Sequence, residues 1–162
     1  MEHKKLHGGL NVQQMHVYNI IVQSVIEKKC GLYFVYGAGG TGKTYLYKTI
    51  LSRLSSEGRI CLSVASSGIV SLLLPVGKTT HSRFSIPIDL NDQSTSNIHQ
   101  GTHLAELMKK TSLIIWDKVP MDHRNTFKAV DQSLKDIMRF NDINSNDKPF
   151  GGIIVLLDGD FR

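Results

Sequence analysis

One eight-residue segment restricts the fold of this chain more than any other feature. Residues Gly37, Ala38, Gly39, Gly40, Thr41, Gly42, Lys43 and Thr44 match the pattern G-x-x-x-x-G-K-[ST] at every required position. In such a segment the glycines let backbone N–H groups approach phosphate oxygens. Lys43 would neutralise the β- and γ-phosphates, and the Thr44 hydroxyl would bind magnesium. The alternative is an ordinary glycine-rich turn between a strand and a helix, which the complete match in this context disfavours.

Apolar runs alternate along the chain with segments of helical period. Strands are predicted at 32–36, 60–64, 113–116 and 153–157, and helices at 12–29, 43–56, 66–74, 103–110 and 122–139. Residues 85–102 and 141–147 are polar and are predicted to be loops. Continuous apolar strands that alternate with helices are typical of a parallel sheet covered on both faces. We therefore expect a three-layer α/β domain that occupies residues 1–162.

A second candidate metal ligand follows the third predicted strand. Asp117 comes directly after the apolar run Leu113–Trp116, where that strand should reach the phosphate edge of the sheet. Residues 37–44 are called the phosphate loop below. ATPases with such a loop use an acidic residue at the end of a neighbouring strand to hold magnesium. The alternative is that Asp117 only caps the strand end. We interpret Lys43 and Asp117 as the catalytic pair, and Thr44 and Asp117 as the magnesium ligands.

The next residue departs from the usual motor ATPase. These enzymes place a glutamate directly after the metal-binding aspartate, where it orients and polarises the attacking water, but this chain has Lys118. A lysine ammonium is a donor only, so it cannot accept a proton or a hydrogen bond from water. Loss of a general base typically lowers the rate by ~10²–10⁴. The sequence thus supports nucleotide binding better than hydrolysis.

Charge and composition narrow the class of protein. The net charge is +5, and residues 1–90 carry ten Lys/Arg against four Asp/Glu. A basic first half suits phosphates of nucleotides or of nucleic acid, but a solvated basic face would look the same. No apolar run approaches the ~20 residues that a membrane span needs, and the two cysteines have no metal-site spacing.

Taken together, these segments resemble the Pif-one-like DNA helicases, in the branch associated with Helitron-type transposons. The resemblance spans Leu10 to Arg162 and implies a RecA-like P-loop domain, incomplete at its C-terminus, without the second motor domain. In Leu10–Gln14, the resemblance makes Gln14 the residue that reads the adenine edge. The segment Asp158–Arg162 resembles the start of the γ-phosphate-sensing motif, although the family usually has glycine where this chain has Asp158.

Two further segments resemble motifs that contact single-stranded DNA. The first is Val64–Val70, which contributes Ser66, Ser67 and Gly68, and the second is Thr80–Phe84, which contributes His81 and Phe84. A helix N-terminus formed by Ser66, Ser67 and Gly68 could bind a phosphate. Phe84 could stack on a base, a contact worth ~1–3 kcal/mol. Two alternatives stay open: Phe84 as a core aromatic and His81 as a hydrogen-bonded loop residue.

The resemblance implies a monomeric, ATP- and Mg²⁺-dependent 5′-to-3′ DNA helicase motor domain that contacts single-stranded DNA. It also implies genome maintenance (repair, recombination, telomeres) in the nucleus or the mitochondrion, with no membrane association. A second hypothesis is a catalytically impaired remnant that binds nucleotide and DNA but does no work. A third, a small-molecule kinase, leaves Gln14 and the 66–70 segment without a role.

Overall fold

The computed structural model describes residues 2–37, 42–66, 71–72, 77–86, 98–99, 101–117, 124–140 and 142–159. Five parallel strands form one sheet in the order β1-β5-β4-β2-β3. The strands are β1 (Leu32–Tyr36), β2 (Ile60–Ala65), β3 (Lys78–Thr79), β4 (Thr111–Asp117) and β5 (Ile154–Gly159). The predicted α/β class with a parallel sheet is confirmed.

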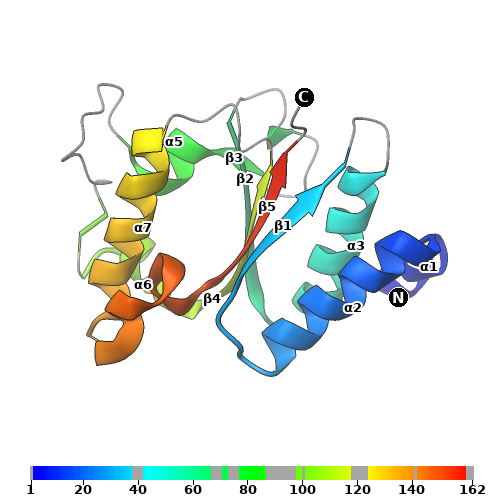
Figure 1. Cartoon of the computed structure of the whole chain (residues 1–162), viewed down its shortest axis with the longest axis horizontal. Helices are drawn as coiled ribbons and strands as arrows, with labels where there is room; N and C mark the ends of the chain where they lie inside the picture. Colours follow the sequence, from blue (N-terminus) through cyan, green and yellow to red (C-terminus); the bar gives the residue numbers. More distant parts are fainter. Residues whose placement is uncertain are drawn as a thin grey trace.

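Helices cover both faces of this sheet (Figure 1). On one side lie α1 (Glu2–Gly8), α2 (Val12–Ile26) and α3 (Lys43–Ser56). On the other lie α6 (His103–Lys110) and α7 (Arg124–Met138), with the short α5 (Thr80–Phe84) beside β3. Two 3₁₀ turns, η2 (Ile143–Asp147) and η3 (Pro149–Gly152), lead into β5. The result is the predicted three-layer arrangement.

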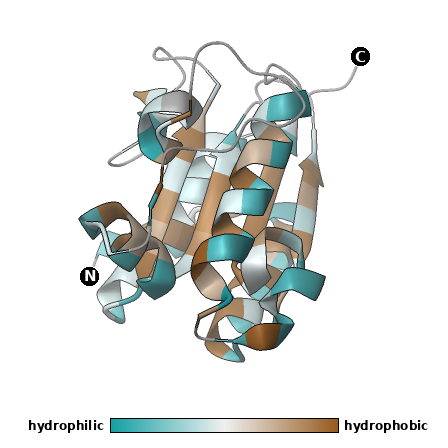
Figure 2. Ribbon diagram, turned by 90° about the vertical axis from the view of Figure 1, so that its left-hand side faces the viewer, coloured by the Kyte–Doolittle hydropathy of each residue, from teal (hydrophilic) through white to brown (hydrophobic). Residues whose placement is uncertain are grey.

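The two faces of the sheet bury separate cores because successive side chains of a strand point to opposite sides. In β4, Leu113 and Ile115 pack with α2 and α3, whereas Ile114 and Trp116 pack with α6 and α7. Figure 2 shows hydrophobic residues along the strands and mixed residues on the helices. A sheet buried on both faces explains why its strands appear in the sequence as unbroken apolar runs.

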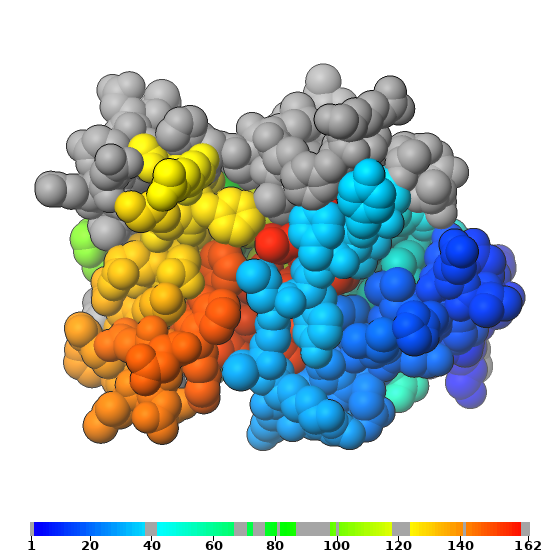
Figure 3. Space-filling model, viewed as in Figure 1, coloured from blue at the N-terminus to red at the C-terminus, as the bar shows by residue number. Residues whose placement is uncertain are grey.

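One edge of the sheet remains partly open. Strand β1 forms this edge, and its residues Leu32, Phe34 and Tyr36 are exposed. Figure 3 shows the molecular face on which this strand lies. Beside it, a hollow of about 400 Å³ lies between β1, α7 and η3. None of the described helices is long and apolar enough to cross a membrane.

The structure changes several predicted boundaries. The first long helix ends at Ile26 instead of residue 29, because Lys28 turns the chain with a φ of 54°. The strand predicted at 113–116 is β4, which runs to Asp117, so the candidate metal ligand is the last residue of that strand. The hydrophobic pattern of the sequence did not predict α1, α5, β3 or the two 3₁₀ turns, because each of these elements is short. Most of the helix predicted at 66–74 lies outside the described residues, as does most of the 85–102 loop.

Candidate nucleotide-binding site

The candidate site lies at the carboxyl edge of the sheet, where β1, β4 and β5 end. Tyr36 pairs with Gly159 across β1 and β5, and Trp116 pairs with Leu157 across β4 and β5. The phosphate loop leaves β1 after Tyr36, while Asp117 and Asp158 follow the second pair on neighbouring strands. Parallel strands therefore bring together residues that are more than a hundred positions apart.

The described part of the phosphate loop is Gly37 and Gly42–Thr44; Ala38, Gly39, Gly40 and Thr41 lie outside the described residues. Gly42 immediately precedes α3 and has a φ of 80°, a conformation that favours glycine. A Cβ at Gly42 would also lie 2.5 Å from the Gln14 Nε2 atom. Helix α3 starts at the loop, so its N-terminal N–H groups and its dipole favour an anion there.

Lys43 is held by two acceptors. Its Nζ atom donates to the Gly37 carbonyl oxygen at 2.6 Å and forms an ion pair with Asp158 Oδ1 at 2.8 Å. The Lys43 side chain is only 10 % exposed and that of Asp158 only 2 %. The cation predicted to bind phosphate thus has a buried carboxylate partner from β5. The sequence placed Asp158 at the start of the γ-phosphate-sensing motif but did not predict its ion pair with Lys43.

Asp117 is buried at the end of β4, opposite Ala65 of β2. Asp117 and Asp158 both lie near the buried hydroxyl of Tyr47 on α3. Burial raises the pKa of Tyr47, and the neighbouring carboxylates of Asp158 and Asp117 raise it further. Both residues alternate along their strands with hydrophobic side chains that pack against α3, so the two acidic side chains lie on the α3 face of the sheet.

The donor set suits magnesium. Mg²⁺ prefers hard oxygen ligands and is usually held by one or two carboxylates together with substrate phosphates and water. Asp117 offers a carboxylate and Thr44 a hydroxyl from the first turn of α3. Among the described residues, no group of three or more His, Cys, Asp or Glu side chains could hold a metal by itself.

Gln14 lies against the phosphate loop. Its Oε1 atom accepts from the Asn11 backbone N–H at 3.0 Å, and its Nε2 atom donates to the Gly42 carbonyl oxygen at 3.2 Å. The Asn11 side chain in turn caps α2 by accepting from the Gln14 N–H at 2.9 Å. A cavity of about 180 Å³ adjoins this contact and is lined by Asn11, Gln13, Gln14, Val17, Val35, Tyr36, Gly37, Lys43 and Leu46. Gln14 thus lines this cavity beside the phosphate loop, while its contact with adenine stays a prediction.

The candidate DNA residues are described only in part. Ser66 follows β2 and is partly buried, whereas Ser67, Gly68 and the side chain of His81 lie outside the described part of the chain. Phe84 belongs to α5 and is fully buried. Its ring centroid lies 5.9 Å from that of Trp116 in the core between the sheet and α7. The structure therefore corrects the base-stacking assignment: Phe84 is the core aromatic that the sequence left as the alternative.

A profile of PIF1-like helicases matches residues 9–162. This chain belongs to the PIF1-like helicase family. It is 32 % identical over 130 residues to the ATP-dependent DNA helicase Pif1 of Psychrobacter sp., covering 79 % of the chain and 19 % of that protein. It is also 32 % identical over 156 residues to RRM3 of Saccharomyces cerevisiae, covering 94 % of the chain and 20 % of that helicase.

Solved PIF1-like structures share the fold. A structure of two coordinating Pif1 helicases at forked DNA matches with a TM-score of 0.75 and 26 % identity, covering 93 % of this chain and 33 % of that one. A Bacteroides Pif1 in complex with ADP-AlF3 and single-stranded DNA matches with a TM-score of 0.74 and 26 % identity, covering 93 % and 32 %. This PIF1-like chain spans about a fifth of the curated relatives and about a third of these structures.

We predict that Phe84 stabilises the PIF1-like fold and does not stack on DNA. Removing a buried aromatic ring typically costs about 3–5 kcal/mol of unfolding free energy. Phe84→Ala should lose that amount in urea denaturation, while Phe140→Ala, which truncates a 68 % exposed ring, should lose little. Weaker binding of single-stranded DNA by Phe84→Ala at unchanged stability would contradict this assignment.

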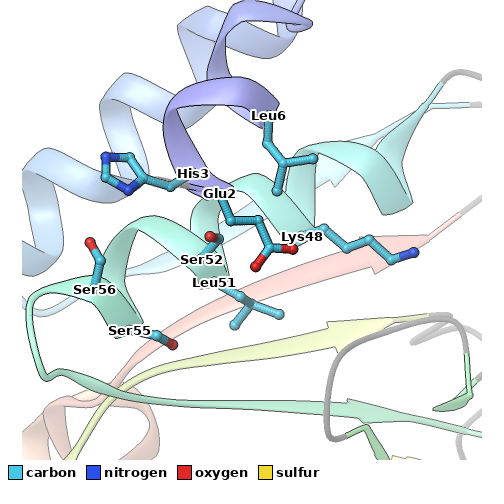
Figure 4. Close-up of a pocket in the computed structure, with 8 residues that line it drawn as sticks. All are labelled: Glu2, His3, Leu6, Lys48, Leu51, Ser52, Ser55 and Ser56. Atoms are coloured by element: carbon cyan, nitrogen blue, oxygen red, sulfur yellow. The ribbon is translucent and has the colours of Figure 1, made fainter.

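A larger hollow of this PIF1-like domain lies away from the candidate site. A cavity of about 700 Å³ lies between α1 and α3 and is lined by Glu2, His3, Leu6, Lys48, Leu51, Ser52, Ser55 and Ser56 (Figure 4). It shares no lining residue with the cavity beside Gln14. The cavity beside Gln14 is smaller, but it is the one bounded by the phosphate loop.

Proposed function

We propose that residues 1–162 form the first RecA-like motor domain of an ATP-dependent DNA helicase, which binds ATP with Mg²⁺ and contacts single-stranded DNA. The observation that carries this proposal is the meeting of Lys43, Thr44 and Asp117 at one edge of a parallel sheet. Lys43 and Thr44 begin α3, and Asp117 ends β4. A phosphate-binding cation, a helix N-terminus and a buried carboxylate are the parts that a nucleotide with magnesium requires.

The proposal has a direct test. The whole chain, with Mg²⁺ present, is titrated into a fluorescent ATP analogue and the analogue is then displaced with unlabelled ATP. Saturable binding that ATP competes away is expected. A chain that is folded by circular dichroism but binds no nucleotide would overturn the proposal.

We also propose that the basic first half supplies part of a single-strand binding surface. Residues 1–90 hold ten of the chain's 19 Lys and Arg residues. Lys78 is exposed on β3 directly before α5, near the carboxyl edge of the sheet. Nucleic-acid binding through phosphates weakens steeply with salt because condensed counterions are released. The Bacteroides Pif1 structure with single-stranded DNA supports this role by analogy.

The expected result is weak, salt-dependent binding of a labelled oligothymidine, measured by fluorescence anisotropy between about 50 and 200 mM salt. Lys78→Glu should weaken binding and reduce the salt slope. Lys110→Glu is the matched control, because Lys110 is also exposed but lies at the amino ends of the strands, next to the start of β4. Equal effects of the two substitutions, or no binding at the lower salt concentration, would argue against this surface.

A second candidate function is a nucleotide-binding remnant of a helicase with impaired hydrolysis. Lys118 favours it, because this residue follows Asp117 where motor ATPases use a glutamate. Family membership argues against the small-molecule kinase hypothesis.

The proposed setting is genome maintenance in the nucleus or the mitochondrion, with a monomeric domain as the working unit.

A further inference from the structure

Asp158 forms an ion pair with Lys43, the cation that the proposed site would use to bind phosphate. The residue is the fifth of β5, between β1 and β4, and it pairs in register with Val35 just before the phosphate loop. Its Oδ1 atom lies 2.8 Å from Lys43 Nζ, and both side chains are at least nine-tenths buried. Within the described residues, Lys43 is the only ion-pair partner of Asp158.

The surroundings of Asp158 make this pair hard to replace. Among the described residues, the Tyr47 hydroxyl and the Asp117 carboxylate also lie near Asp158, and neither is a cation. A buried carboxylate that loses its cation keeps the cost of desolvation without the compensating attraction. Nucleotide binding that recruits Lys43 to the β- and γ-phosphates must therefore pull the ammonium away from Asp158 or bring the phosphates against this carboxylate.

We propose that Asp158 is a specificity-determining residue of the phosphate site, which competes with the nucleotide's phosphates for Lys43. This inference rests on the proposed function, since it assumes that nucleotide binds at the phosphate loop. The carboxylate takes the place of a phosphate oxygen in the site and so lowers nucleotide affinity. The penalty is larger for ATP than for ADP, because the γ-phosphate adds negative charge beside Lys43 and Asp158.

The test is isothermal titration of the whole chain with ATP and with ADP, each with Mg²⁺. Asp158→Asn keeps the shape of the side chain and removes its charge. It should raise ATP affinity by at least about tenfold, and ADP affinity by less. Asp142→Asn is the matched control, because Asp142 pairs with Lys148 at 2.9 Å in an exposed ion pair outside the site. This control should bind both nucleotides as the unaltered chain does.

A second variant covers the risk that Asp158→Asn destabilises the fold by leaving Lys43 buried with a neutral partner. Asp158→Gly removes the side chain and opens space for water around the ammonium, and it should show the same preference for ATP. Thermal unfolding with and without nucleotide provides an independent measure. The stabilisation by saturating ATP should be larger in both Asp158 variants than in the unaltered chain.

Lys43→Ala and the double variant Lys43→Ala/Asp158→Asn separate this inference from the proposed function. The gain from Asp158→Asn should be smaller in the Lys43→Ala background, because the competition for Lys43 is absent there and only the direct repulsion between Asp158 and the phosphates remains. If Lys43→Ala weakens binding but folded Asp158 variants gain no ATP affinity, the inference is wrong and the proposed function stands. If no folded variant binds nucleotide, or if Lys43→Ala has no effect, the proposed function fails and the inference fails with it.

Discussion

Replacing Lys43 by alanine should reduce ATP affinity roughly 10- to 100-fold, because charge-assisted hydrogen bonds to an ion contribute about 1.5–3 kcal/mol. In the phosphate-loop pattern the lysine is the residue whose charge neutralises the β- and γ-phosphates, and Lys43 is expected to do so here. Fluorescence titration with an ATP analogue measures the change, with circular dichroism as the control for folding. Unchanged affinity in a folded Lys43→Ala chain would remove the basis for assigning this loop to phosphate binding.

The structure adds a control that the sequence alone does not suggest. Lys43→Ala leaves Asp158 buried without its cation, and breaking one side of a buried ion pair typically costs about 3–5 kcal/mol of stability. In the double variant Lys43→Ala/Asp158→Asn, neither charge remains. It should recover much of that stability and still bind ATP weakly. Recovery of stability without recovery of binding separates the phosphate-binding role of Lys43 from its structural role.

Replacing Lys118 by glutamate should raise DNA-stimulated ATP hydrolysis by ~10²-fold or more, the usual scale for restoring a general base. Motor ATPases also need an arginine finger, which is worth ~10³–10⁵ in rate. The comparison therefore belongs in a chimera that joins this domain to the second motor domain of an intact relative. Phosphate release, measured with and without single-stranded DNA, gives the rate.

Magnesium affinity provides a second readout for Lys118→Glu. It should improve, because Asp117 would no longer neighbour a lysine that competes with the metal for its charge. Lys118→Gln is the matched control, since it removes the cation without supplying a carboxylate base. If the chimera with Lys118 already hydrolyses ATP as fast as the glutamate variant, Lys118 is not a lesion and another residue accepts the proton. Asp122 and Asp160 are the first candidates.

The sequence thus departs from the usual motor ATPase at two positions whose residues have opposite charge. Lys118 is a cation that follows the last residue of β4, and Asp158 is an anion near the end of β5. The first is expected to affect hydrolysis and the second nucleotide affinity. Because the two substitutions are tested by different measurements, a chain carrying both Lys118→Glu and Asp158→Asn should show both gains.

Local sequence determined the framework of this protein. Four strands and most of the long helices were predictable because a strand buried on both faces must be a continuous apolar run, and because an amphipathic helix repeats its apolar residues with the helical period. The phosphate loop and Asp117 could also be identified from the sequence as candidate site residues. Their chemistry depends on residue types at short, fixed spacings that end in a strand or begin a helix.

Only the tertiary structure decided how distant residues share the site. From the sequence, Phe84 could have stacked on a base or packed in the core. Its burial against Trp116 depends on how α5 packs on the sheet. The Lys43–Asp158 pair joins residues on α3 and β5, and the contact of Gln14 with Gly42 joins α2 to the phosphate loop. The apolar pattern identifies each strand separately. The order β1-β5-β4 that puts the lysine beside the aspartate follows from packing of the whole sheet.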